Sequence, residues 1–121
     1  MAKQQAKQER RESIAYARAN KVRIAPRKAR LVIDQIRGMN VAVALATLEA
    51  TRRRANPIVR DCLKSAIANA VEKDGSLNPD DLIVTEAKVD QGRVLKRMRP
   101  RAYGRGSLIM KHSSHITLAV G

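Results

Sequence analysis

The residues best suited to chemistry in this chain are the cations of one short segment, GRVLKRMRPRAYGRG at residues 92–106. Six of its 15 residues are Lys or Arg, and none is acidic. Ammonium and guanidinium groups bind phosphates by displacing their counter-ions, whereas like charges this dense repel one another in a free loop. The segment therefore predicts contact with a polyanion, which would order it.

Further cations lie toward both ends of the sequence, which carries a net charge of +14. Residues 1–30 carry a net charge of +8 and residues 91–121 carry +7, whereas residues 56–90 carry −3. Such segregation is typical of a surface built for phosphate rather than for solubility alone. Charge therefore adds further predicted phosphate contacts at Arg18, Lys21, Arg23 and Arg93, and the run of three arginines in the middle of the chain adds Arg52, Arg53 and Arg54.

Groups that could support catalysis or hold a metal are scarce. His112 and His115 are the only histidines, and a spacing of three places them on opposite faces of a strand. Cys62, the single cysteine, falls in an apolar helical pattern that is typical of a buried, inert thiol. No glycine-rich phosphate loop leads into a helix. We therefore expect no enzyme, no cofactor and no metal site.

Length and composition limit the fold and its compartment. A chain of 121 residues suits one domain, and a hydrophobic fraction of 44% is typical of a folded protein. We expect that domain to span residues 13–121, after a mobile polar arm at residues 1–12. The lone cysteine excludes an internal disulfide, and no apolar run is long enough to cross a membrane. The cytoplasm is the expected compartment.

Three helices are predicted to position the cations. The first begins at Pro26 and stops before Gly38, and its apolar stripe is Ala29, Val32, Ile33 and Ile36. Arg30 and Asp34 lie one turn apart on it and can pair. Asn40 caps a second helix, and a third ends near Lys73. The third helix begins either at Pro57, with Asn56 as its cap, or near Thr51.

Alternating residues predict an antiparallel sheet. In residues 13–24 the apolar members of one face are Ile14, Tyr16, Val22 and Ile24. Residues 82–91 alternate, and so does the last stretch, with Leu108, Met110, Ile116, Leu118 and Val120 on one side. Since strands close in sequence pair antiparallel, residues 82–120 are expected to form an extended β-hairpin with its basic tip at 92–106. The predicted fold is α+β.

Three sequence blocks resemble the bacterial ribosomal protein L-twenty-two family of the large subunit. They are APRKARLVIDQIRG at 25–38, LKSAIANA at 63–70 and KRMRPRAYGRGSLIMKHSSHITLAV at 96–120. The resemblance implies three helices packed on a small antiparallel sheet, with a long protruding β-hairpin. It also implies a structural role in the large subunit, in which the protein binds ribosomal RNA, aids assembly and places its hairpin tip in the peptide exit tunnel.

The resemblance assigns roles to individual residues of this sequence. As RNA contacts it implies Arg27, Lys28, Arg30, Lys96, Arg97, Arg99, Pro100, Arg101, Tyr103, Arg105, Lys111, His112, Ser114 and His115. As the tip that lines the tunnel it implies Lys96, Arg97, Met98, Arg99, Pro100 and Arg101. The implied partners are large-subunit ribosomal RNA, neighbouring ribosomal proteins and the nascent peptide. No membrane and no homo-oligomer is expected.

Other classes of function stay open at this stage. A DNA-binding β-ribbon would place two strands in the major groove, and it is the main alternative. An enzyme acting on nucleic acid lacks an acid–base pair, and a membrane-surface protein lacks a basic helix with bulky aromatics. For Tyr103, base stacking and packing across the hairpin are both compatible with the sequence.

Overall fold

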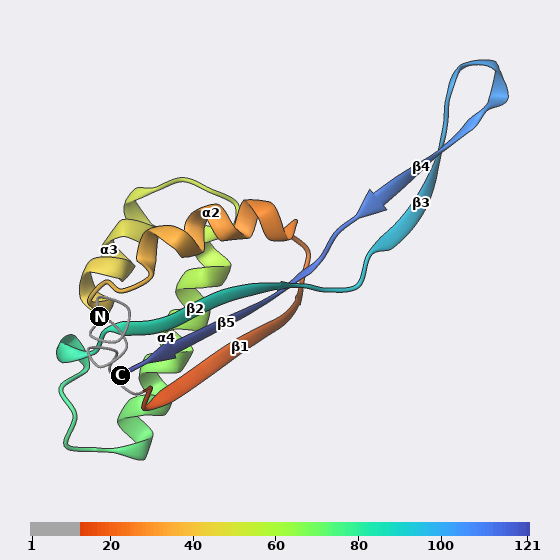
Figure 1. The fold of residues 1–121 in the computed structure, drawn as a ribbon. Coiled ribbons are helices and arrows are strands. Elements are labelled where there is room, and N and C mark those ends of the chain that lie inside the picture. Colours follow the sequence, from red (N-terminus) through yellow and green to blue (C-terminus); the bar gives the residue numbers. More distant parts are fainter. Residues whose placement is uncertain (1–12) are drawn as a thin grey trace, which may run out of the picture.

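A computed structural model describes residues 13–121, so the predicted arm at residues 1–12 lies outside the described residues. Three helices and five strands, with two short 3-10 turns, confirm the α+β class (Figure 1). In chain order they are β1 (Ala15–Val22), α2 (Pro26–Ile36), α3 (Val41–Ala50), α4 (Asn56–Lys73), η1 (Pro79–Asp81), β2 (Val84–Gln91), β3 (Leu95–Pro100), η2 (Ala102–Gly104), β4 (Gly106–Lys111) and β5 (Ser114–Val120).

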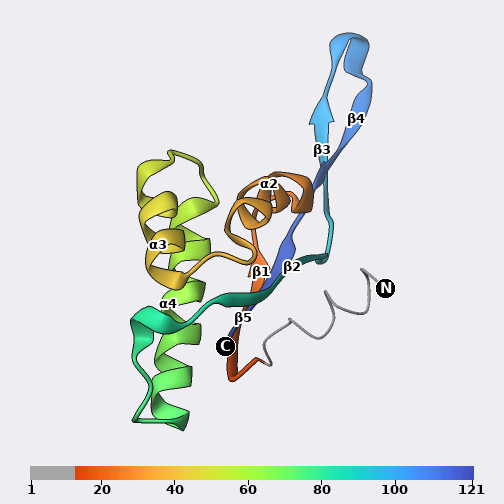
Figure 2. The ribbon, with the colours of Figure 1, turned by 60° about the vertical axis from the view of Figure 1, so that its left-hand side comes forward.

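The body of the protein has two layers. Strands β1, β5 and β2 form an antiparallel sheet in that order, and the helices lie on one side of it (Figure 2). Helix α4 packs against β1 and β5, α2 packs against β2, and α3 packs mainly on α4. Paired Ala17, Leu118 and Ala87 are buried, whereas Arg18 and Lys88 on the opposite face are exposed. This alternation is expected of an antiparallel sheet that is covered on one face.

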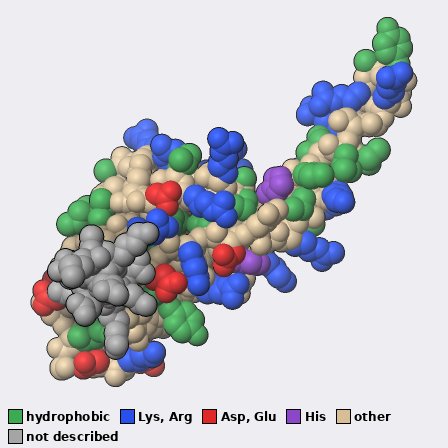
Figure 3. Space-filling model, viewed as in Figure 1, with side chains coloured by type: hydrophobic (Ala, Val, Ile, Leu, Met, Phe, Trp, Pro, Cys, Tyr) green, Lys and Arg blue, Asp and Glu red, His purple; other side chains and the backbone are tan. Residues whose placement is uncertain are grey.

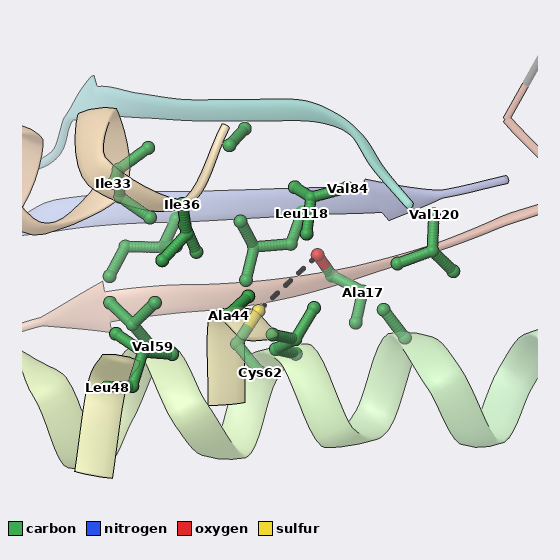
Figure 4. Packing of buried hydrophobic residues seen from close by; sticks show 14 of the residues in the cluster. Ala17, Ile33, Ile36, Ala44, Leu48, Val59, Cys62, Val84, Leu118 and Val120 are labelled. Carbon is green, nitrogen blue, oxygen red and sulfur yellow. Dashed lines mark hydrogen bonds between the residues drawn. The ribbon is translucent and has the colours of Figure 1, made fainter. Parts of the chain in front are cut away.

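Aliphatic side chains from both layers fill the core (Figure 4). Ile33 and Ile36 of α2, Leu63 of α4 and Leu118 of β5 are all fully buried. Truncating such a side chain to alanine typically costs about 2–5 kcal/mol of stability, because a cavity remains. The apolar stripe predicted for the first helix is therefore the face that holds α2 on the sheet.

Helix α2 begins and ends where its sequence predicts. Pro26 occupies its first position, and Gly38 follows its end with φ +83°. A left-handed φ strains any residue with a Cβ, so glycine suits this position. The Gly38 N–H then donates to the Val84 carbonyl at 3.0 Å, which joins the helix end to the sheet. Asp34 pairs with Arg37 at 3.0 Å rather than with Arg30.

Asn56 ties α3 to α4. Helix α4 begins at Asn56 with Ala55 as its N-cap, so the prediction that Asn56 is the cap is wrong by one residue. The Asn56 side chain is buried, and its Nδ2 donates to the carbonyls of Leu48 and Thr51 at the end of α3. Free carbonyls at a helix end need donors, so this amide closes the end of the preceding helix.

The outer edges of the sheet accept hydrogen bonds from helix side chains. On β2, the Ala87 carbonyl accepts from Arg37 Nε at 3.1 Å and Nη2 at 2.6 Å, and the Val89 carbonyl accepts from Arg30 Nη2 at 3.2 Å. On β1, Asn69 Nδ2 donates to the Tyr16 carbonyl at 3.0 Å, and Lys73 Nζ donates to the Ile14 carbonyl at 3.2 Å. Exposed edge strands recruit further strands, and these donors occupy both edges.

The faces predicted for β1 change along the strand. Ala15 and Ala17 face the core and Tyr16 is 66% exposed, whereas the core side chain further along is Ile24. The register of β1 shifts between Ala19 and Val22, and such a bulge moves the following side chains to the other face. The prediction of one continuous parity from Ile14 to Ile24 is therefore wrong.

Strands β3 and β4 form a separate two-stranded ribbon that projects from the body (Figures 1 and 2). Their antiparallel pairing runs from Leu95↔Lys111 to Pro100↔Gly106. No residue between Leu95 and Lys111 is buried. The predicted last strand is therefore two strands, β4 and β5. Leu108 and Met110 of β4 are about half exposed, so the prediction that they share one side with the buried β5 residues is wrong.

Candidate nucleic-acid interface

The ribbon, residues 95–111, presents cations on both faces. Arg97 and Arg99 pair across the strands with Ile109 and Ser107, and they alternate with Lys96 and Met98. All four β3 side chains are exposed. Lys and Arg are spread along the ribbon without an acidic neighbour (Figure 3), since residues 91–121 contain no Asp or Glu. The ribbon can therefore contact phosphate on either face.

The ribbon ends in a tight turn that exposes an aromatic ring. Tyr103 adopts a left-handed backbone conformation with φ +61°, and its side chain is fully exposed. The Arg101 N–H donates to the Arg105 carbonyl at 2.6 Å and closes the turn. A non-glycine residue in this conformation costs about 1–3 kcal/mol and occurs most often at functional sites. The alternative in which the Tyr103 ring packs across the ribbon is wrong, because the ring is exposed.

Three hollows surround the place where the ribbon leaves the body, and Arg23 lines all of them. The first, of about 440 Å³, is lined by Arg23, Ile24, Ala25, Lys28, Leu31, Arg53, Arg54 and Ala55. The second, of about 560 Å³, is lined by Arg23, Ala25, Lys28, Arg54, Met110, Lys111 and His112. The third, of about 320 Å³, is lined by Lys21, Arg23, Arg93, Leu95, Lys111, His112, Ser113 and His115. We call them together the basic junction.

The basic junction joins predicted contacts that lie far apart in the sequence. Cations from β1, α2, the turn before α4 and the ribbon line it, and no acidic residue does. A concave surface with cations of one sign concentrates the field that attracts anions. The arrangement can therefore hold several phosphate groups of one polyanion at once.

Not every predicted contact is free to bind RNA. Ser114 is fully buried and its hydroxyl donates to the Ile24 carbonyl, so the structure does not support an RNA contact by this side chain. His115 Nδ1 accepts from the Lys21 N–H at 3.1 Å. Arg30 donates to the edge of β2, and Arg18 lies on the outer sheet face, away from the basic junction. These side chains serve the fold or lie apart from the hollows.

The two histidines line one hollow, contrary to the expected opposite faces. The chain leaves the β conformation between β4 and β5, at His112 and Ser113, so the simple alternation does not pass through them. Among residues 13–121 no group of His, Cys, Asp or Glu is arranged to hold a metal ion. The hollow is thus lined mainly by basic side chains and the two histidines.

Cys62 lies in the core rather than at the surface (Figure 4). Its Sγ donates to the Ala17 carbonyl at 3.6 Å. Burial raises the pKa of the Cys62 thiol above its ordinary value of 9.0, because the charged thiolate is poorly solvated there. The thiol therefore stays protonated near neutral pH and is a poor nucleophile.

A known protein family matches most of this chain. The family model described as ribosomal protein L22p/L17e matches residues 17–121. The chain belongs to this family. A relative is the large ribosomal subunit protein uL22 of Oceanobacillus iheyensis, which is 55% identical over 106 residues that cover 88% of this chain and 93% of the relative. The family resemblance predicted from the three sequence blocks is confirmed, and the protein is a ribosomal protein.

Some residues around the hollows had no signal in the sequence. Ser113 and Gly92 connect the ribbon to the body by hydrogen bonds. In the sequence, a serine and a glycine near strand ends look like ordinary loop residues. Arg37 resembled the other cations near α2, although it donates to β2.

No helix among the described residues has the length and apolarity to cross a bilayer.

Proposed function

We propose that this protein is a structural component of the large ribosomal subunit that binds ribosomal RNA through the ribbon and the basic junction. The observation that carries the proposal is the basic junction itself, which gathers cations from four parts of the chain without an acidic residue. Its place in the cytoplasm follows from that of the ribosome. The mechanism needs no catalysis and no cofactor.

Binding would be electrostatic and geometric. Each Lys or Arg that meets a phosphate releases a condensed counter-ion, and that release favours binding at low salt. A six-residue strand extends about 20 Å, so the ribbon can reach between RNA helices that the body does not touch. One rigid protein that contacts separated RNA segments would hold them in one arrangement and so aid assembly of the subunit.

The turn at the end of the ribbon suits contact with unpaired bases. Single-stranded RNA is commonly bound by stacking of bases on aromatic side chains. The exposed ring of Tyr103 is flanked by Arg101 and Arg105, which can bind the adjacent phosphates. This arrangement supports stacking as the role of Tyr103.

We further propose, on the strength of the family resemblance, that residues of β3 and of the turn after it line the peptide exit tunnel. The residues concerned are Lys96, Arg97, Met98, Arg99, Pro100 and Arg101, and all of them are exposed. The nascent peptide and neighbouring ribosomal proteins would then be partners besides RNA. The tunnel placement rests on family membership rather than on the geometry of the isolated chain.

Sedimentation of the tagged protein in a cell lysate tests the proposed function. We expect it to migrate with large ribosomal subunits and to remain there at moderate salt. Purified protein should also prefer large-subunit RNA to duplex DNA in competition. Protein that stays at the top of the gradient, or that duplex DNA displaces from RNA as readily as RNA does, would contradict the proposal and favour the DNA-binding ribbon.

A further inference from the structure

Three backbone irregularities coincide where the ribbon meets the body (Figure 1). The chain leaves the β conformation at residues 92–94, between β2 and β3, and again at residues 112–113, between β5 and β4. Opposite them, β1 changes register between Ala19 and Val22, and Lys21 has φ +56°. The ribbon is therefore not a simple continuation of the body sheet.

Three consecutive side chains connect this place to two other segments, the start of the ribbon and the end of β1 with the residues that follow it. The Ser113 hydroxyl donates to the Arg93 carbonyl at 2.5 Å, and the Ser114 hydroxyl donates to the Ile24 carbonyl. His115 Nδ1 accepts from the Lys21 N–H at 3.1 Å. Both serines are buried, at 9% and 0% exposure, although neighbouring Lys111 and His112 are exposed. The tripeptide thus ties β5 to the start of the ribbon and to the segment after β1.

Gly92 completes the connection by close approach. Its N–H donates to the Ser113 carbonyl at 2.8 Å. A Cβ at position 92 would lie 2.7 Å from Ser113 Oγ, 3.2 Å from the Ser113 carbonyl carbon and 3.3 Å from its oxygen. A contact of 2.7 Å forces one of the two groups to move. Glycine lets the two segments approach at this distance without a shift of the Ser113 side chain.

We propose that Gly92, Ser113, Ser114 and His115 form a ribbon joint that sets the direction in which the ribbon leaves the body. The inference rests on the proposed function, in which the ribbon must enter RNA while the basic junction holds the body. Ser114 and His115 are then positioning residues, and not the RNA contacts that the family resemblance implied. Tying the segments by these hydrogen bonds, of which the Ser114–Ile24 bond is buried, fixes their relative orientation before RNA is present.

The ribbon joint must hold the direction of the ribbon against repulsion between the cations around it. Lys21, Arg23, Arg93 and Lys111 all line the same hollow, and like charges repel. A tilt of about 20° at the base of a ribbon about 20 Å long moves its tip by about 7 Å, which is more than a base-pair step. Losing one hydrogen bond or the close contact of the ribbon joint should therefore misplace the tip while leaving the body folded.

The experiment measures the ribbon direction in the free full-length protein. Spin labels are attached to Ala102→Cys in the turn and Glu49→Cys on α3, in a Cys62→Ala background, and their distance distribution is recorded. Gly92→Ala should shift or broaden that distribution and weaken binding to large-subunit RNA by 10-fold or more. Gly75→Ala is the matched control, since a Cβ there meets nothing within 4 Å, and it should change neither quantity.

A second variant tests the close contact itself. Adding Ser113→Ala to Gly92→Ala removes the Oγ that the new Cβ would meet, and it should return the distance distribution part of the way toward the parent. Ser113→Ala alone, which removes the bond to Arg93, should broaden the distribution, and it serves if Gly92→Ala does not fold. Unchanged distributions in both single variants would overturn the ribbon joint. Shifted distributions in a protein whose parent does not bind RNA would retain the joint and reject the proposed function.

Discussion

The basic side chains of this protein fall into two groups according to what lies within reach of them. Arg23 and Arg54 line hollows without an acidic residue. Arg30 and Arg37, on the same helix as Lys28, instead donate to carbonyls of β2. Charge in the sequence does not separate the two groups. Only the position of β2 beside α2 assigns Arg30 and Arg37 to the protein itself.

Cys62 gives a pH dependence at the scale of a single residue. Its raised pKa means that below the ordinary value of 9.0 the thiol is neutral in both states and the stability it contributes is complete. Above that value the unfolded chain ionises first, so stability falls as pH rises until the folded pKa is passed. We expect the free energy of unfolding in urea to fall more steeply between about pH 8 and pH 10 for the native chain than for Cys62→Ala.

The comparison with Cys62→Ala cancels the titration of the lysines and tyrosines, which both proteins share. Parallel pH curves for the two proteins would show that the thiol ionises equally easily in the folded and unfolded chain. Such a result would place Cys62 outside the core.

At the scale of elements, side chains from the helix layer donate hydrogen bonds to the outer edges of the sheet. Arg37 of α2 reaches the free edge of β2 with two donors, and it also pairs with Asp34 at 3.0 Å. Arg37→Gln should lower the free energy of unfolding by about 1 kcal/mol, since a charged donor to a carbonyl is worth more than a neutral one but this side chain is half exposed. RNA affinity should change little.

Arg27→Gln on the same helix is the matched control for Arg37→Gln. Arg27 is exposed, and the structure gives it no hydrogen bond within residues 13–121. Its loss should leave urea unfolding within about 0.5 kcal/mol of the parent and weaken RNA binding. The opposite pattern, with Arg37 needed for RNA and Arg27 for stability, would refute the division between the two arginines.

The elements themselves were predictable where local rules dominate. Pro26, Gly38 and the apolar stripe of α2 act within one helix, and the sequence predicted them correctly. The bulge in β1, the break before Ser114 and the Asn56 bridge to α3 depend on segments that are distant in sequence. Alternation alone cannot reveal them, because a single bulge inverts the faces that follow. The buried role of Ser114 was missed for the same reason.

At the scale of the whole molecule, the packed body provides the stability and the ribbon extends away from it. The core lies between the sheet and the helices, whereas the ribbon buries no residue between Leu95 and Lys111. Removing the ribbon should therefore leave the body folded. What the ribbon adds is six cations, namely Lys96, Arg97, Arg99, Arg101, Arg105 and Lys111.

The most direct test of RNA binding by the ribbon is the salt dependence of that binding. The affinity for large-subunit RNA is measured across a range of salt, for the full chain and for a variant in which an Asn-Gly turn replaces residues 95–111. If the six ribbon cations meet phosphates, the slope of log affinity against log salt should be shallower by about 4 to 5 in the variant. Equal slopes for the two proteins, with the variant folded, would contradict the account.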